Sequence, residues 1–218
     1  MLSPVARVSL SVSVATGLYG ISYGALAIAA GLSVWQAQLL SLAMFTGGSQ
    51  FAFVAAIPGG GPAAVGAASL MGVRNAIYGA QVNAELRPRG LERVMAAHVT
   101  IDESVAVSMA QPVTDGDDAQ RRRGFWLTGW GVFLFWNLNT LVGSLVTSRI
   151  DPAAWGLDGA AVAAFVALLW PRLKQRQAWA VAILAALAAV LVTPWLPLGT
   201  PILIAAVIAG LLGWRWAK

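Results

Sequence analysis

One arginine within a long apolar stretch is the residue best placed to do chemistry. Residues 9–84 are almost wholly apolar or small, yet Arg74 lies among them. A charge at bilayer depth costs from about 2.5 to more than roughly 10 kcal/mol, so such residues usually face a cavity and carry function. A guanidinium can hold a carboxylate through two parallel hydrogen bonds. We therefore expect Arg74 to face a polar path and to bind a carboxylate there.

Three further ionisable residues interrupt the next apolar stretch, and they could move a proton. His98 and Asp102 are four residues apart, so they would touch on one helix, and Glu103 follows directly. Histidine and membrane-embedded carboxylates commonly take up and release protons in transporters. A second interpretation stays open, in which Arg74 pairs with Asp102 or Glu103 as a structural ion pair.

Two adjacent glycines predict a broken helix. Gly47 and Gly48 lie inside the apolar run 33–57 and are followed by Ser49 and Gln50. Glycines in mid-span weaken a helix and free backbone groups, and secondary transporters build substrate sites at such breaks. We expect this backbone and Gln50 to offer acceptors to an ammonium group. The candidate substrate-binding residues are Phe45, Gly47, Gly48, Gln50, Phe51, Arg74, Asn75 and Tyr78.

Composition indicates a membrane protein and argues against an enzyme. Of 218 residues, 58% are hydrophobic and 11% charged, against about 25% charged in soluble domains. Cysteine is absent and histidine occurs once, so thiol chemistry and thiolate metal sites are excluded, and we predict no cofactor. The net charge of +5 comes from basic residues at the ends of apolar runs, as in membrane proteins, and does not predict nucleic-acid binding.

The pattern of apolar runs predicts an all-α fold in a single polytopic transmembrane domain over 1–218. The segment 94–111 is too polar for a plain span and fits a re-entrant or interfacial helix, and 112–124 reads as an aqueous loop. Placing the basic loops inside puts the N-terminus outside. An inverted repeat with halves 1–111 and 124–218 is a further hypothesis. The seven predicted crossings are 9–31, 33–57, 63–85, 125–147, 156–171, 178–195 and 198–214.

Two smaller patterns concern helix packing. Gly20 and Gly24 form a motif that lets two helices approach closely. Asn137 and Asn139 lie inside a span, where each either hydrogen-bonds to a neighbour or lines the path.

Three blocks of the chain together resemble a known family. The stretch 17–57, with its Gly17–Gly24 and Phe45-x-Gly47-Gly48-x-Gln50-Phe51 motifs, is similar to the N-terminal half of the AzlC or YgaZ family of branched-chain amino-acid permeases. The blocks VRNAIYGA (73–80) and HVTIDESVAVS (98–108) look like that family's arginine–tyrosine and Thr-Asp-Glu segments. One departure is Gly72, where the family often has asparagine.

The resemblance implies export of branched-chain or similar small apolar amino acids across the cytoplasmic membrane. It also implies a large subunit that works with a small AzlD- or YgaH-type membrane partner. We expect secondary-active export, with the carboxylates and His98 coupling it to protons. The alternative is a passive channel or pore-forming subunit for small solutes, which would leak without depending on a proton gradient.

Overall fold

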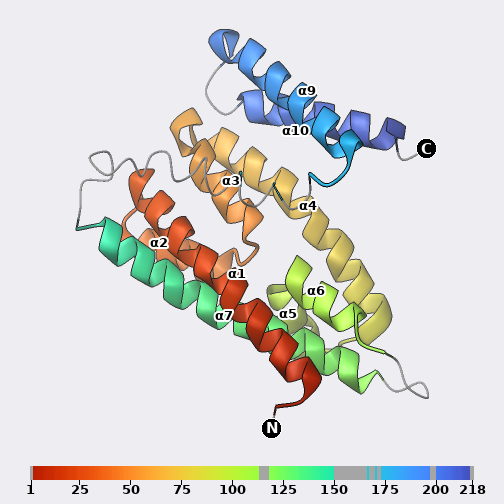
Figure 1. The fold of residues 1–218 in the computed structure, drawn as a ribbon. Coiled ribbons are helices and arrows are strands. Elements are labelled where there is room, and N and C mark those ends of the chain that lie inside the picture. The colour runs from red at the N-terminus through yellow and green to blue at the C-terminus, as the bar shows by residue number, and fades with distance from the viewer. Residues whose placement is uncertain are drawn as a thin grey trace.

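The computed structural model describes residues 2–112, 118–149, 166, 170, 173–196 and 200–216, and all regular structure in them is helical (Figure 1). This confirms the all-α class. The predicted span 156–171 lies outside the described residues except for positions 166 and 170. The helices are α1 (Pro4–Ala29), α2 (Val34–Ala43), α3 (Gly48–Ala56), α4 (Gly61–Leu86), α5 (Leu91–Val99), α6 (Asp102–Met109), α7 (Ala119–Thr147), α9 (Arg176–Val192) and α10 (Thr200–Trp216).

Three segments in the described part of the chain are long and apolar enough to cross a membrane: Pro4–Ala29, Ala119–Thr147 and Arg176–Trp195. Helix α4 has the same length as α1 but carries Arg74 near its middle and Glu85 near its end. Helices α9 and α10 pack on each other (Figure 1). Leu203 of α10 lies beside Gly66 of α4. The count of seven crossings therefore stays a prediction, with one exception described below.

Helices α1 and α7 form a tightly packed parallel pair. Near their beginnings the Thr128 hydroxyl donates to the Ser9 hydroxyl at 3.0 Å, and near their ends the Ser144 hydroxyl donates to the Gly24 carbonyl at 3.4 Å. A Cβ atom at Gly20 or Gly24 would collide with the backbone of α7. The predicted close-approach motif is thus confirmed, and its partner is α7.

Helix α4 runs opposite to this pair. Its last turn meets the beginning of α7, where Arg121 contacts Glu85 at 2.7 Å and the Arg122 guanidinium donates to the Leu86 carbonyl. The parallel orientation of α1 and α7 then places the C-terminal end of α4, the beginning of α7 and the N-terminus at one end of the molecule. We call this the N-terminal end, and the opposite end the distal end.

Helices α2 and α3 form a re-entrant pair. The chain enters from the distal end through α2 and returns to that end through α3. Helix α3 packs antiparallel to α4, because Gly48 lies beside Arg74 at the middle of α4 while Ala56 clusters with Ala64 near its beginning. Since α1 ends distally, α2 must descend to mid-depth before α3 climbs back. Gly47 makes the reversal at φ +59° and ψ −86°, a conformation open only to glycine. The break is confirmed, but the prediction that 33–57 crosses is wrong.

Helices α5 and α6 form the matching re-entrant pair from the N-terminal end. Arg122 pairs with Glu92 in the first turn of α5, and the Ser108 hydroxyl, near the end of α6, donates to the Arg121 carbonyl at 2.9 Å. The Asn75 amide, at the middle of α4, donates to the carbonyl of Thr100 between the two helices at 3.4 Å. The segment 94–111 therefore does not cross, as predicted.

Two expectations about this half of the chain are wrong. His98 lies in the last turn of α5 and Asp102 begins α6. They do not share a helix face, because the backbone is extended at Thr100 and Ile101 between them. The loop predicted over 112–124 is shorter, since α7 already begins at Ala119 and its first turns carry the paired arginines.

The parallel packing of α1 and α7 also corrects the predicted topology. The N-terminus was expected on the side opposite Arg121, because three crossings were counted before the first basic loop. The segment 33–57 supplies none of them, so Pro4 and Arg121 lie at the same end. With the basic residues inside, the N-terminus is inside as well.

Candidate functional site

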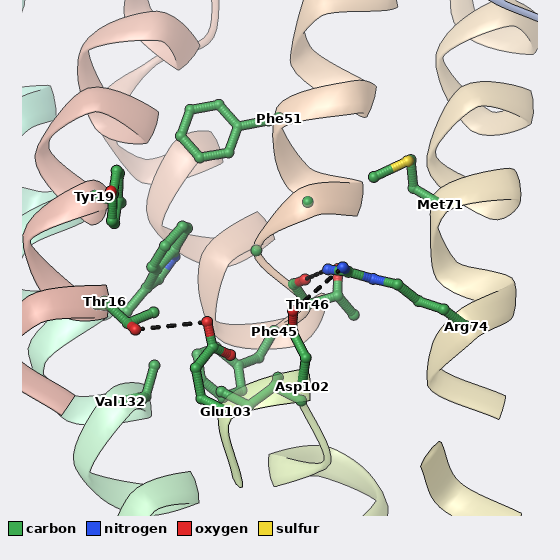
Figure 2. A pocket seen from close by; sticks show the side chains of 14 residues that line it. Thr16, Tyr19, Phe45, Thr46, Phe51, Met71, Arg74, Asp102, Glu103 and Val132 are labelled. Atoms are coloured by element: carbon green, nitrogen blue, oxygen red, sulfur yellow. Dashed lines mark hydrogen bonds and ion pairs between the residues drawn. The ribbon is translucent and has the colours of Figure 1, made fainter. Parts of the chain in front are cut away.

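The two helix breaks meet at the middle of α4 and enclose a cavity of about 420 Å³ (Figure 2). Ligand pockets are commonly about 300–1,000 Å³. The re-entrant pairs, α1, α4 and α7 all contribute side chains. The lining residues are Thr16, Tyr19, Phe45, Thr46, Gly47, Gly48, Phe51, Met71, Arg74, Ile101, Asp102, Glu103, Val132 and Trp136.

Arg74 reaches from α4 to both breaks. Its Nη1 atom lies 3.4 Å from Asp102 Oδ2, and its Nη2 donates to the Thr46 carbonyl at 3.5 Å (Figure 2). Its Nε–H is buried and has no partner among the described residues. The ion-pair interpretation is therefore correct for Asp102, and both ends of the guanidinium fork are engaged within the protein.

Glu103 is the second carboxylate of the cavity. The Thr16 hydroxyl of α1 donates to Glu103 Oε1 at 3.5 Å (Figure 2). Helix α6 has eight residues, far fewer than the about 20 that cross a bilayer, and it returns to the end from which its segment enters. Burial raises the pKa of the Glu103 carboxyl above its usual range, and the negative charge of Asp102 adds to the shift. Glu103 is thus suited to take up a proton.

The beginning of α3 presents donors to the cavity rather than acceptors. Gln50 Oε1 accepts from the Gly47 amide at 3.2 Å, so the carboxamide caps the helix it belongs to. Gln50 itself is buried and does not line the cavity. The first amides of a helix have no intrahelical partner, so this break exposes N–H groups. The Gln50 side chain is therefore not at the cavity as an acceptor for an ammonium group, and the role expected of this break stays a prediction.

The structure brings seven predicted site residues to the cavity: Phe45, Gly47, Gly48, Phe51, Arg74, Asp102 and Glu103. Four others lie outside its lining. Asn75 donates to Thr100, and Tyr78 packs against a second apolar cluster. The His98 ring packs 6.2 Å from that of Phe45, and Gln50 caps α3.

Sequence reasoning did not assign the other lining residues to the substrate site. Thr16 and Tyr19 are three apart on α1, and Met71 lies one turn before Arg74, so helical spacing could have found them. Trp136 lies within a span rather than at its end, so its position differs from that of the tryptophans in an interfacial aromatic belt. Asn137 and Asn139 each donate to the carbonyl four residues earlier, and Asn137 also accepts from Gln38.

No three histidine, aspartate or glutamate side chains within the described ranges could hold a metal ion together. The cavity instead combines a paired arginine, two carboxylates, amide donors and aromatic walls. Such a set suits the non-covalent binding of a small molecule with separated charges and an apolar body.

Comparison with known proteins agrees with this geometry. The family model described as AzlC protein matches residues 11–150, well over half of the chain, and this range contains every residue that lines the cavity. No curated protein and no solved structure matches the chain. The chain belongs to the AzlC family, of the branched-chain amino-acid permease type, and membership implies a function in the transport of these amino acids across a membrane.

Proposed function

We propose that this protein exports branched-chain or similar small apolar amino acids by secondary-active transport. The observation that carries the proposal is a single cavity with charges of both signs beside an apolar wall. Arg74 and the beginning of α3 form its positive part, and Glu103 forms its negative part. Met71 and Phe51 add apolar surface for an aliphatic side chain. A zwitterion with an apolar side chain is complementary to this arrangement.

The broken helices support a transporter over a static pore. Secondary transporters place their sites near mid-membrane, between discontinuous helices whose ends face the substrate. Here α3 and α6 both begin at the cavity, and each returns to a different end of the molecule. A small movement of either re-entrant pair would open the cavity to one end at a time, which is what alternating access requires.

Glu103 is the proposed coupling residue. Its carboxyl is half-buried, faces the cavity and accepts a hydrogen bond from the Thr16 hydroxyl of α1. Protonation on one side of the membrane and release on the other would link export to a proton gradient. Asp102 is less suited to this role because its carboxylate is paired with the Arg74 guanidinium.

The family supports two further parts of the proposal. We place the chain in the cytoplasmic, inner membrane as the large subunit of a two-component exporter. A small AzlD- or YgaH-type membrane protein would be its partner. The requirement for a partner is tested by expressing the chain with and without such a subunit.

The direct experiment is uptake into inside-out vesicles. Radiolabelled leucine, isoleucine, valine and methionine are supplied with and without the partner, and a pH gradient is imposed or collapsed. We expect the four amino acids to accumulate only with the gradient, and lysine and glutamate to be excluded. Equilibration without accumulation, at a rate independent of the gradient, would instead identify a pore.

A further inference from the structure

The beginning of α3 holds amide donors that the protein does not use. The Gly47 amide donates to Gln50 Oε1, and the amides of Gln50 and Phe51 donate to the Gly47 carbonyl at 3.0 and 3.2 Å. The hydrogen bonds within the described ranges leave the amides of Gly48 and Ser49 without a partner. The helix N-terminus therefore carries a partial positive charge, and of these two residues Gly48 lines the cavity.

A tryptophan supplies an independent sign of a missing acceptor. The Trp136 side chain lines the cavity and is 4% exposed, yet its indole N–H has no partner among the described residues. A buried donor without an acceptor is costly and is rare in native structures. The ring lies beside the backbone break, since its Cη2 atom is 3.8 Å from where a Cβ of Gly47 would stand. Stacking on Tyr23 and an edge contact with Phe51 fix the ring in place.

Arg74 adds positive charge at this end of the cavity but is not itself free. Its Nη2 atom lies 3.0 Å from where a Cβ of Gly48 would stand, so the guanidinium rests against the first turn of α3. Both Nη atoms are engaged, by Asp102 and by the Thr46 carbonyl. A substrate carboxylate would gain from the charge of Arg74, whose only unpaired donor within the described ranges is the buried Nε–H, and the amide donors of α3 lie beside it.

The beginning of α6 has the opposite character. Its first turn contains Asp102 and Glu103, whose negative charge offsets the partial positive charge of the helix N-terminus. The first turn of α3 contains no acidic residue. The cavity therefore has an anion-binding end at α3 and a cation-binding end at α6.

Resting on the function proposed above, we propose that the substrate carboxylate binds at the N-terminus of α3. It accepts hydrogen bonds from the Gly48 amide and from the Trp136 indole. The ammonium group then faces Glu103, and the amino acid lies across the cavity between the two re-entrant pairs. Trp136 is on this account a substrate-binding residue that selects for a carboxylate.

The test uses three ligands of one shape. Leucine has both charged groups, 4-methylpentanoate lacks the ammonium, and 3-methylbutylamine lacks the carboxylate. Binding is measured by titration calorimetry on the purified chain in lipid nanodiscs. The variant is Trp136→Phe, which removes the N–H and keeps an aromatic ring, and the matched control is Trp130→Phe on the same helix, outside the cavity.

We expect Trp136→Phe to weaken leucine and 4-methylpentanoate about tenfold, as loss of one hydrogen bond to a charged group does, and to leave 3-methylbutylamine unchanged. Trp130→Phe should alter none of the three. Equal weakening of all three ligands, or unchanged leucine binding in Trp136→Phe, would overturn the inference.

A second variant keeps the inference testable if Trp136→Phe does not fold. Glu103→Gln should weaken leucine and 3-methylbutylamine and spare 4-methylpentanoate, and the reverse pattern would contradict the proposed orientation. Wild-type protein that binds neither leucine nor 4-methylpentanoate also overturns it. Leucine that binds in this selective manner but is not exported contradicts the proposed function alone, and export with no such selectivity contradicts this inference alone.

Discussion

Arg74 at the middle of α4 and Asp102 at the first position of α6 form an ion pair, with Nη1 and Oδ2 3.4 Å apart. The contact joins residues 28 positions apart and fastens the re-entrant pair α5–α6 to α4. The same guanidinium donates to the Thr46 carbonyl at the other break. One side chain thus joins the two helix breaks beside the cavity.

Removing the acidic partner should destabilise the protein more than removing both. Both side chains are partly buried, so Asp102→Asn should cost about 1–3 kcal/mol, between the roughly 1 kcal/mol of an exposed pair and the 3–5 kcal/mol of a buried one. In Arg74→Gln plus Asp102→Asn no unpaired charge remains, and part of the loss should return. Thermal unfolding in detergent measures both variants. A double variant no more stable than Asp102→Asn would show that the pair is not what holds the breaks.

Two glycine-to-alanine substitutions should act in opposite directions. Gly47 has φ +59° and ψ −86°, so Gly47→Ala forces strain worth about 1–3 kcal/mol at the break. Gly79 lies within α4 with open space around it, so Gly79→Ala should stabilise by about 0.5–1 kcal/mol through helix propensity. Thermal unfolding of both variants against wild type tests this. A Gly47→Ala protein as stable as Gly79→Ala would mean that the reversal does not depend on glycine.

The sequence predicted the parts of this molecule that depend on residue type. The charge of Arg74 within an apolar run and the glycine pair at 47–48 correctly predicted residues of the cavity. The cost of burying a charge and the backbone freedom of glycine depend on the residue itself, so the sequence shows them. Chain direction depends instead on tertiary packing. An apolar run such as 33–57 is long enough to cross, and only its contacts with α4 and α7 show that it turns back. Trp136 was missed for the same reason, since its unused N–H becomes visible only when its neighbours are placed.

Cysteine labelling tests the revised topology, because the chain has no cysteine of its own. Single cysteines at Pro4 and Asp118 should react with an impermeant maleimide from the same, cytoplasmic side. A cysteine at Gly60, between α3 and α4 at the distal end, should react only from outside. Labelling of Pro4 and Asp118 from opposite faces would contradict the parallel packing of α1 and α7.

Replacing Thr16 should weaken the positioning of Glu103 without removing its charge. Thr16→Val deletes the hydroxyl that donates to Glu103 Oε1 and keeps the β-branched shape. Loss of a donor to a carboxylate raises the pKa of that carboxyl, so the pH at which export is half-maximal should shift upwards. Thr16→Ser, which keeps the hydroxyl, should behave as wild type. An unchanged pH profile in Thr16→Val would show that this contact does not tune the coupling.

Proton-coupled export through the cavity is the central claim, and leucine accumulation in proteoliposomes tests it most directly. Wild type, Glu103→Gln and Glu85→Gln are each reconstituted with the partner subunit and exposed to the same imposed pH gradient. Glu85 pairs with Arg121 away from the cavity, so its variant makes the same chemical change outside the site. The account predicts gradient-driven accumulation by wild type and Glu85→Gln, and leucine exchange without accumulation by Glu103→Gln. Full gradient-driven accumulation by Glu103→Gln would contradict it.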